Sequence, residues 1–377
     1  MSIAKPIRVL HVIRQGLIGG GESHVLTLVD KLDGKSVSSY VLSFTDGPMV
    51  PQLRAMNVPV HVIPIKNALD WRLYSGVRKF LVEEQIDLIH AHGSRACAFI
   101  IILARLLKIK VIYTIHGWSF HPDQSRWVKL IRRTAERIIT GLTTKNICVS
   151  DSNLQTGQQL YSSFKAEVVK NGIDVQKYSM ARIFRDYRME WEVPSNAKLI
   201  LYAARLTLQK QPIVALEAFE FAAKQIPDVF MVIVGDGELL DEVRDKIKTL
   251  SSKNRIRLRS FYTDMPGVYH ASDVFILPSL WEGLPMALLE AMSMGKVVVA
   301  TAVDGTKELI QHRQNGLLID VSDSISSNLG RRIVEVISDQ FLFKELSSQA
   351  IKTVELEYNS IFMADKIKDI YQECLIS

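Results

Sequence analysis

The sequence has 377 residues, of which 47% are hydrophobic and 23% are charged, and a chain of this length is expected to form about two globular domains. This composition excludes a disordered chain, a collagen-like fibre and a small disulfide-rich scaffold. The formal net charge is +6, but residues 1–180 carry 23 Lys and Arg against 13 Asp and Glu, a surplus of +10, whereas the remainder carries −4. The basic first half indicates an anionic partner, such as a membrane surface, a phosphorylated substrate or a nucleic acid.

The cysteines and the apolar runs indicate the cellular compartment of the protein. Cys97, Cys148 and Cys374 are far apart in the sequence, a spacing that predicts neither a zinc site nor a disulfide framework and favours a reducing compartment. The first residues lack the apolar segment of a signal peptide. The longest apolar run covers residues 96–104, and a membrane span needs about 20 residues. We therefore expect a cytoplasmic protein with a buried helix over 96–104.

In chain order, the first half alternates short apolar runs with helical patterns. Strands are predicted at residues 7–13, 39–44, 59–64, 86–90, 110–115 and 146–150. A helix over 23–32 follows the first strand across a glycine-rich turn. Runs rich in Val and Ile that alternate with helices are typical of a parallel sheet covered on both faces.

The same pattern restarts after about residue 195. Strands are predicted at 198–203, 229–234, 256–259 and 274–278, and a strand at 297–301 closes the series. Helices are predicted over 212–225 and 284–294, and the polar segment 175–194 is predicted to be a linker. The sequence therefore predicts two doubly wound α/β domains. A last amphipathic helix over 358–374 must cover an apolar surface.

Glycines and histidines follow predicted strands of the first domain. Glycines at 16 and 19–21 precede a helix, whose free N–H groups can hold a phosphate, although an ordinary tight turn would use the same residues. His90, His92 and His116 stand at the ends of two strands. Ligands bind at this edge of open α/β sheets, whereas a lone histidine there is more often structural. The histidine spacing indicates no metal site.

Cations and carboxylates stand out in the second domain. Arg205 and Lys210 follow its first strand; they suit phosphate oxygens, and the alternative is a pair of solvated surface cations. Glu282 precedes the helix predicted over 284–294, and Glu290 lies two turns inside it among apolar residues. A buried carboxylate is costly unless it is paired. A ribose diol would be a suitable partner, and an internal ion pair is the alternative.

Together these features resemble glycosyltransferase family 4. The resemblance rests on Glu282-x7-Glu290 within Pro-Ser-x-x-Glu-Gly-x-Pro, on Arg205 with Lys210, and on three further motifs: Val234-Gly-Asp-Gly, Lys170-Asn-Gly-Ile-Asp174 and Gly19-Gly-Gly-Glu22. It covers nearly the whole chain. It implies a GT-B fold, in which two Rossmann-like domains face a central cleft. Residues 1–175 would form the acceptor-side domain, with 358–377 crossing back to it, and 176–357 would bind the nucleotide sugar.

The family implies an activity and assigns residues to it. The activity is retaining transfer of a sugar from a UDP- or GDP-sugar to a glycan or lipid-linked acceptor, in polysaccharide, lipopolysaccharide or glycolipid assembly, with no cofactor and no metal. The implied roles are diphosphate binding by Arg205 and Lys210, ribose binding by Glu290, and contact with the transferred sugar by Glu282 beside the Gly283–Leu284 backbone. The resemblance also places Gly19 and Gly20 at the diphosphate, His116 at the donor sugar and Tyr262 near the nucleobase. His116 and Glu282 are the expected catalytic residues.

The sequence departs from the family pattern at two positions. Ala204 stands where the family usually has Gly, and Gln211 stands where it commonly has Gly or Asn; both affect loop shape rather than charge. A sugar-nucleotide epimerase with the same fold and a non-catalytic partner subunit are the alternative interpretations. A Rossmann oxidoreductase is a weaker one, because the glycines lack the G-x-G-x-x-G spacing.

The basic surplus is concentrated in one predicted helix. It contains Arg126, Lys129, Arg132, Arg133 and Arg137, with Trp118, Phe120 and Trp127 nearby. Basic and aromatic residues together favour an anionic membrane face, here the inner face of the cell membrane. A solvated helix face is the alternative. We expect no nucleic-acid binding, because no recognised motif accompanies the charge.

Overall fold

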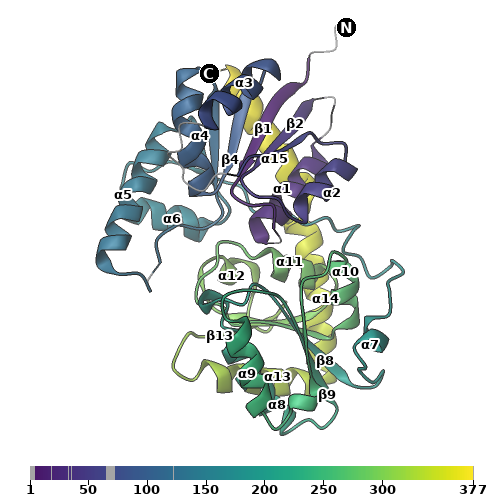
Figure 1. Ribbon diagram of the computed structural model, residues 1–377. Helices are drawn as coiled ribbons and strands as arrows, with labels where there is room; N and C mark the ends of the chain where they lie inside the picture. The colour runs from purple at the N-terminus through teal and green to yellow at the C-terminus, as the bar shows by residue number, and fades with distance from the viewer. Residues whose placement is uncertain are drawn as a thin grey trace. The chain divides into compact units, whose positions relative to one another are not determined.

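The computed structural model describes residues 5–17, 19–32, 34, 36–64, 73–121 and 123–376. The chain divides into two compact units (Figure 1). The first unit comprises Met1–Gly172 together with Ser360–Ser377, and the second comprises Ile173–Asn359. Each unit contains one parallel sheet flanked by helices.

The first unit is built on a seven-stranded sheet in the order β3-β2-β1-β4-β5-β6-β7, within the residues that the structure describes. Its strands, all paired in parallel, are β1 (Ile7–Ile13), β2 (Val37–Ser43), β3 (Val60–Val62), β4 (Leu88–His92), β5 (Lys110–Ile115), β6 (Lys145–Cys148) and β7 (Glu167–Val168). The strand order places β1 and β4 side by side at the centre, with His11 opposite His90. The carboxyl ends of these strands form the edge at which open α/β sheets bind ligands.

Helices cover both faces of this sheet because alternate strand residues point to opposite sides. Leu10 and Val12 of β1 pack in one apolar cluster with helix α4 (Ser94–Leu106), which contains the predicted buried run. Val9 packs on the other face with residues of α1 (Gly20–Lys31) and α15 (Ser360–Ile376). Among the residues that the structure describes, the remaining helices of the unit are α2 (Met49–Ala55), α3 (Tyr74–Glu83), α5 (Arg126–Leu142) and α6 (Asp151–Leu160).

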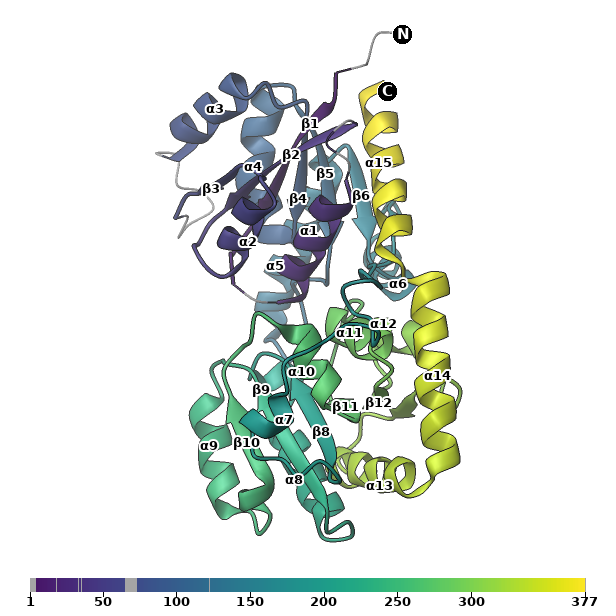
Figure 2. The same cartoon turned by 90° about the vertical axis from the view of Figure 1, so that its right-hand side faces the viewer.

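Helix α15 belongs to the first unit although 187 residues separate it from Gly172 in the sequence. Figure 2 shows it alongside the first-unit strands. Its Tyr371 hydroxyl lies 2.6 Å from His90 Nδ1, and the Lys110 ammonium donates to the Cys374 carbonyl oxygen at 2.6 Å. The helix begins at Ser360 rather than at the predicted 358, because Tyr358 is the C-cap of the preceding helix α14 (Gln340–Glu357).

The second unit contains a six-stranded parallel sheet in the order β10-β9-β8-β11-β12-β13. Its strands are β8 (Lys198–Ala203), β9 (Val229–Val234), β10 (Ile256–Arg259), β11 (Val274–Leu277), β12 (Val297–Thr301) and β13 (Leu317–Ile319). Its other elements are α7 (Tyr187–Glu190), η2 (Leu208–Lys210), α8 (Pro212–Ala223), α9 (Leu240–Thr249), η3 (Lys253–Arg255), α10 (Met265–Ala271), α11 (Met286–Ser293), α12 (Asp304–Leu309), α13 (Ile325–Ser338) and α14 (Gln340–Glu357). The prediction that 297–301 is the last strand of the series is wrong, because the three-residue β13 follows it and pairs with β12.

The predicted linker over 175–194 is instead a packed part of the second unit. Trp191 is fully buried and stacks on Tyr187, and the Arg188 guanidinium donates to the Asp273 carboxylate at 2.6 Å. The sequence did not predict these contacts because the segment is mostly polar and only a few aromatic residues in it are buried. The second unit begins at Ile173, so the whole of this segment belongs to it.

Candidate functional site

In the second unit, the loop after β8 carries the two predicted phosphate-binding cations. Arg205 is exposed, and Lys210 ends the short helix η2 just before Pro212 opens α8. The buried Tyr202 hydroxyl donates to the Lys210 carbonyl oxygen at 3.1 Å. A Cβ at Gly235 would lie 2.0 Å from the Ala204 carbonyl oxygen, so the Val234-Gly-Asp-Gly motif allows the next strand end to approach this loop closely.

Lys210 is paired with Glu282, so the structure brings together two residues that the sequence assigns to different parts of the donor. The Lys210 ammonium donates to Glu282 Oε1, and the two side chains are 16% and 7% exposed. Gln209 supports the contact from both sides: its side chain donates to the Trp281 carbonyl oxygen at 2.7 Å, and its own carbonyl oxygen accepts from Leu280 N at 2.9 Å. The loop after β8 and the loop after β11 therefore form one hydrogen-bonded assembly.

The turn formed by Gly283 and Leu284 rests on the start of α12, a contact that the sequence analysis missed. The Asp304 carboxylate accepts from Glu282 N at 3.2 Å, and a Cβ at Gly305 would lie 1.8 Å from the Gly283 carbonyl oxygen. Burial raises the pKa of Asp304. Asp304 also has a backbone φ of +31°, an unusual conformation for a residue with a side chain. An acidic residue followed by glycine after β12 was the only signal in the sequence.

Glu290 is a buried carboxylate on α11, as predicted, but its partner is not a cation. Its Oε2 accepts a hydrogen bond from the Tyr269 hydroxyl at 2.8 Å. Burial raises the pKa of Glu290, and hydrogen bonds from Tyr269 and Tyr178 partly oppose this shift. Glu290 is thus a buried carboxylate that accepts hydrogen bonds from hydroxyl groups, and the hydroxyl groups of a ribose are donors of the same kind.

Tyr262 lies in an aromatic group of the same unit. Its hydroxyl accepts from the Trp191 indole N–H at 3.0 Å and donates to Glu190 Oε1 at 3.2 Å. Its ring meets the Tyr187 ring edge to face at 5.2 Å. Both the hydroxyl group and the ring of Tyr262 therefore make contacts within the unit.

In the first unit, the glycine turn and His116 come together. Gly19 is the N-cap of α1 and Gly20 its first residue, and a Cβ at Gly21 would lie 3.9 Å from the His116 ring. A Cβ at Gly19 would lie 2.6 Å from a Glu22 carboxylate oxygen. The Glu22 carboxylate therefore lies near the N-terminus of α1, where the positive end of the helix dipole stabilises a negative charge.

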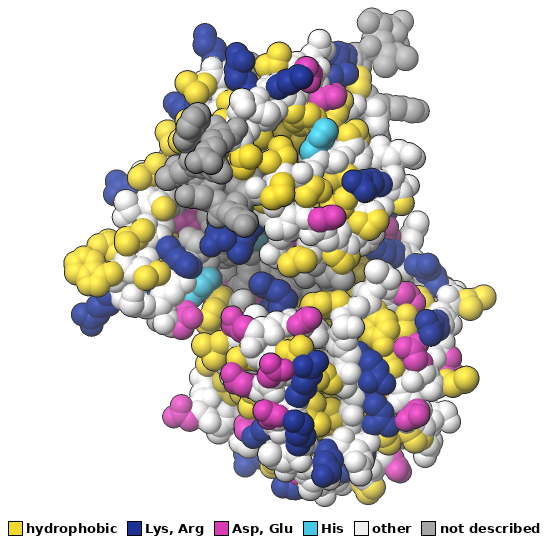
Figure 3. Space-filling view, viewed as in Figure 1, with side chains coloured by type: hydrophobic (Ala, Val, Ile, Leu, Met, Phe, Trp, Pro, Cys, Tyr) yellow, Lys and Arg dark blue, Asp and Glu magenta, His cyan; other side chains and the backbone are white. Residues whose placement is uncertain are grey.

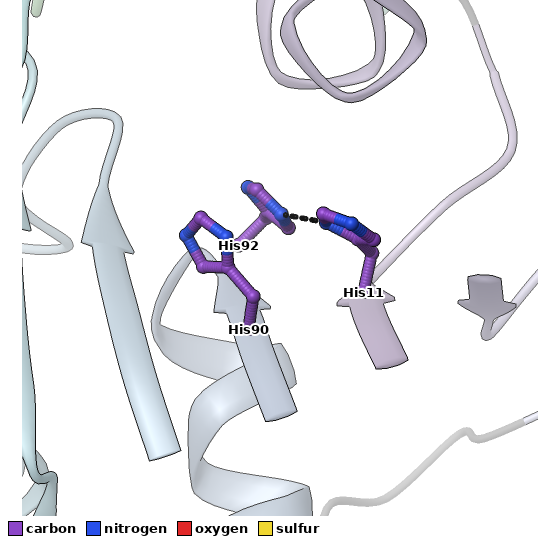
Figure 4. Close-up of side chains that lie close together, drawn as sticks. All are labelled: His11, His90 and His92. Atoms are coloured by element: carbon purple, nitrogen blue, oxygen red, sulfur yellow. Dashed lines mark hydrogen bonds between the residues drawn. The ribbon is translucent and has the colours of Figure 1, made fainter. Parts of the chain in front are cut away.

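His116 also belongs to a group of five histidines that the sequence analysis only partly found. His90 and His92 lie on β4 and His11 on the adjacent β1, where their side chains share one face of the sheet (Figure 4). The ring nitrogens of His92 lie 3.2 Å from a ring nitrogen of His11 and 3.2 Å from a ring nitrogen of His116. The rings of His24 and His116 meet edge to face, with their centroids 4.7 Å apart. Burial lowers the pKa of His11 to about 3 and that of His24 to about 4. The pKa values of His90, His92 and His116 are also lowered, chiefly by burial.

The nitrogen atoms of two histidine sets are close enough to hold a metal ion. The sets are His11 with His90 and His92, and His24 with His92 and His116, and in each the ligand atoms lie within 4.8 Å of one another. Both ring nitrogens of His90 contact hydroxyl groups, Nδ1 that of Tyr371 and Nε2 that of Thr114 at 2.7 Å. The first set is therefore poorly suited to a metal.

The basic helix α5 exposes apolar side chains. Trp127 is 76% exposed, Leu130 55%, Ile131 67% and Ile138 56%, and this spacing places them on one side of the helix. Figure 3 shows hydrophobic side chains gathered over α5 with basic side chains beside them. Trp118, expected near this surface, is instead buried against Phe164 and donates to the Asn153 carbonyl oxygen.

Comparison with known proteins decides the family. The model described as Glycosyltransferase Family 4 matches residues 18–177, and the model described as Glycosyl transferases group 1 matches residues 184–354. A UDP-Gal:alpha-D-GlcNAc-diphosphoundecaprenol alpha-1,3-galactosyltransferase of Escherichia coli is 30% identical over 387 residues, covering 100% of this chain and 99% of that protein. The chain belongs to glycosyltransferase family 4. This glycosyltransferase is also 24% identical to the O-antigen biosynthesis glycosyltransferase WbnH of Escherichia coli, over 93% of this chain and 98% of that protein.

Solved structures identify the fold of the glycosyltransferase as GT-B. HepE of Anabaena, crystallised with UDP-glucose, superposes with a TM-score of 0.85 at 22% identity and covers 97% of this chain and 100% of its own. A glycosyltransferase of Rickettsia africae gives a TM-score of 0.81 at 21% identity, over 98% and 99% of the two chains. The predicted α/β fold class is therefore confirmed. In the described parts of the glycosyltransferase, we find no helix whose length and hydropathy would let it span a bilayer.

Proposed function

We propose that the enzyme transfers a hexose, with retention of configuration, from a UDP-sugar to a sugar carried on a lipid diphosphate. Such a reaction would serve the assembly of a surface polysaccharide or lipopolysaccharide. The donor and acceptor classes are supported by the Escherichia coli relative, whose name specifies UDP-Gal and a diphosphoundecaprenol-linked GlcNAc. The observation that supports the proposal comes from the second unit. The Lys210 cation is paired with Glu282, and Glu282 precedes α11, the helix that contains the buried carboxylate of Glu290.

Arg205 and Lys210 would bind the donor diphosphate. The exposed Arg205 can present its guanidinium fork to phosphate oxygens, and Lys210 can exchange its Glu282 partner for a phosphate. Both cations then stabilise the negative charge that grows on the diphosphate as the sugar–phosphate bond breaks. Glu282, released from Lys210, would be available to the hydroxyl groups of the transferred sugar.

The remaining donor contacts are proposed from the family resemblance. Glu290 would accept hydrogen bonds from the ribose hydroxyls, and the N–H groups of the Gly283–Leu284 turn would contact the sugar. The Tyr262 ring would lie near the nucleobase. In the first unit, Gly19 and Gly20 would contact the diphosphate, and His116 would contact the donor sugar.

Retention places the acceptor on the face of the sugar from which the diphosphate departs. As the anomeric C–O bond to phosphate breaks, the acceptor hydroxyl forms the new C–O bond from the same side, and its proton passes to the departing phosphate oxygen. The cations hold that oxygen in position, so the reaction needs no enzymic nucleophile. We also expect it to need no divalent metal.

A donor screen with product analysis tests this proposal. Purified enzyme is incubated with UDP-galactose, other UDP-sugars or GDP-sugars, with and without a GlcNAc-diphosphate lipid, in the presence of EDTA. We expect UDP release that depends on the acceptor and an α-linked product by NMR coupling constants. A β-linked product refutes retention, and activity abolished by EDTA and restored by manganese refutes metal independence. Epimerised UDP-sugar without transfer supports the epimerase, and binding of the donor without turnover supports a non-catalytic subunit.

We also propose that α5 places the enzyme on an anionic membrane, where a lipid-linked acceptor resides. The exposed apolar residues of α5 would enter the interface, and basic residues beside them would meet anionic headgroups, each contributing roughly 1 kcal/mol. The basic residues are Arg126, Lys129, Arg132, Arg133 and Arg137. Of these, Arg132 also donates to the Ser119 carbonyl oxygen at 2.6 Å, which helps to hold α5 on its unit.

Vesicle flotation separates this proposal from a merely solvated helix. We expect binding to phosphatidylglycerol-containing vesicles, little binding to phosphatidylcholine vesicles, and loss of binding in the Trp127→Ser/Ile131→Ser variant. Phe341→Ser is the matched control, because Phe341 is 77% exposed on α14 of the second unit. Equal flotation of both variants would rule out the α5 surface.

A further inference from the structure

The buried histidines of the first unit form a chain of imidazole rings. His11 Nδ1 lies 3.2 Å from His92 Nε2, and His92 Nδ1 lies 3.2 Å from His116 Nε2. The ring centroids of each pair are 5.5 Å apart and the planes differ by only 20° and 22°. Since the facing nitrogens are so much closer than the centroids, the rings lie end to end, as N–H···N hydrogen bonds require.

This arrangement suits a hydrogen-bonded chain better than a metal site. Each nitrogen of His92 is directed at a different ring, one toward His11 and the other toward His116. Ligands on a tetrahedral ion would instead converge on one point. Figure 4 shows His92 and His11 facing each other through their nitrogens, with His90 beside His92.

The environment of His11 determines which way the hydrogen bonds between the histidines run. His11 is fully buried, and its Nε2 has no hydrogen-bond partner among the described residues. Burial keeps the pKa of His11 near 3, so at neutral pH the ring carries one proton, on either Nδ1 or Nε2. Orphaned buried N–H groups are rare in folded proteins, so a proton on the unpartnered Nε2 is disfavoured. The proton is therefore on Nδ1, and His11 donates to His92 Nε2.

The proton position on His11 then determines the proton positions on His92 and His116. Because His92 Nε2 accepts, the single proton of the neutral ring is on Nδ1, which donates to His116 Nε2. His116 Nε2 is consequently an acceptor, and His116 carries its proton on Nδ1. We propose that His11 and His92 are positioning residues that fix His116 in the Nδ1-protonated tautomer.

The fixed tautomer has a chemical consequence, which rests on the proposed contact of His116 with the donor sugar. The Nε2 lone pair of His116 is committed to His92, so this nitrogen cannot take the proton of the acceptor hydroxyl. The Nδ1–H group is the one that His116 can offer to a sugar or phosphate oxygen. His116 thus serves the reaction as a hydrogen-bond donor, and the proton is left to the departing phosphate.

Histidine ¹⁵N NMR on the ligand-free enzyme tests the tautomer directly. The full chain is labelled with ¹⁵N-histidine, and the His116 signals are assigned by their loss in His116→Asn. We expect a protonated Nδ1 and an unprotonated Nε2 on His116 at pH 7.5. A protonated Nε2 overturns the inference. Because this measurement needs no turnover, it stands or falls separately from the proposed transferase reaction.

A pair of His11 variants tests the positioning role. His11→Leu removes the donor at the end of the chain, so His116 should become a mixture of tautomers, and kcat should fall about tenfold with KM for the donor within about twofold. His11→Asn keeps an N–H donor close to the position of Nδ1 and should restore both the tautomer and kcat. His90→Leu is the matched control, since His90 is equally buried on the same face but outside the chain; it should leave the His116 tautomer unchanged. A single His116 tautomer in His11→Leu, or equal kcat in Leu and Asn variants, overturns the positioning role.

Discussion

The ion pair between Lys210 and Glu282 should have a measurable energetic signature. Replacing Lys210 with Met removes the ammonium and leaves Glu282, whose side chain is 7% exposed, without its cation. Removing one partner of a buried pair typically costs 3–5 kcal/mol, because the remaining charge is buried alone. Since Lys210 is itself 16% exposed and water can reach the position it leaves, we expect a cost below this range, about 2–3 kcal/mol.

A thermal unfolding experiment checks this magnitude. For a unit the size of residues 173–359, a loss of 2–3 kcal/mol corresponds to a melting temperature lower by about 5–10 °C. Adding Glu282→Gln to Lys210→Met should recover most of this loss, because no buried carboxylate remains unpaired. Sugar transfer should be lost in both variants, since neither retains the ammonium for the diphosphate.

The control is Arg205→Met. Arg205 is exposed, so its replacement should abolish transfer while leaving the melting temperature of the protein within about 2 °C of wild type. The reasoning is refuted if Lys210→Met melts with the wild type, or if the double variant melts as low as the single one. Near-normal turnover in Lys210→Met would refute the phosphate role independently of its stability.

Three further predictions concern the nucleotide, the turn and the histidines. Glu290→Ala should weaken UDP binding at least tenfold by calorimetry, because a charged hydrogen bond contributes about 1.5–3 kcal/mol. Gly305→Ala should destabilise the second unit and abolish transfer, because its Cβ would lie 1.8 Å from the Gly283 carbonyl oxygen. The protein should also lose stability in mild acid, because His11 and His24 have pKa values lowered to about 3 and about 4. In the unfolded chain both histidines take up protons near pH 6.5, whereas in the folded chain they stay neutral. The free energy of unfolding is therefore at its full value above pH 6.5. Below that pH it falls by about 2.7 kcal/mol per pH unit for the two residues, down to about pH 4.

Each of these expectations has an opposing outcome. An unchanged UDP affinity in Glu290→Ala would contradict the ribose contact. Wild-type melting and turnover in Gly305→Ala would mean that α12 does not support the sugar-binding turn. Urea unfolding at pH 7.5 and pH 5 gives the acid effect, and His24→Phe should flatten that dependence. An identical slope in wild type and variant would contradict burial of a neutral His24.

The sequence was sufficient for the fold because the strands are long apolar runs with little ambiguity. Residues 7–13 and 198–203 were predicted as strands and form β1 and β8 with those bounds. Two of the shortest strands, β7 with two residues and β13 with three, were missed because so few residues show no period, although the three-residue β3 was predicted within 59–64. The segment 175–194 was misjudged because its burial depends on isolated aromatic residues such as Trp191.

The candidate site was predictable where the chemistry depends on residue type and not where it depends on contacts. Arg205, Lys210, Glu282 and Glu290 stand out as charges in unusual surroundings. The pairing of Lys210 with Glu282 spans 72 positions in the sequence, and no local pattern encodes such a distance. His11 was invisible for the same reason: it stands in the middle of an apolar strand, and only the pairing of β1 with β4 brings it to His92.

The return of α15 to the first unit has a consequence for how the protein is made. The first unit is assembled from two stretches of polypeptide, with the whole second unit encoded between them. A ribosome that has synthesised residues 1–172 has not yet made the helix that covers Val9, Leu88 and Ile112. That apolar face, which Leu28 and Leu32 cover in part, lacks α15 while the second unit is synthesised and folds. A truncated gene ending near residue 172 should therefore yield an aggregating fragment, whereas residues 173–359 have every sheet partner they need and are the better choice for separate expression.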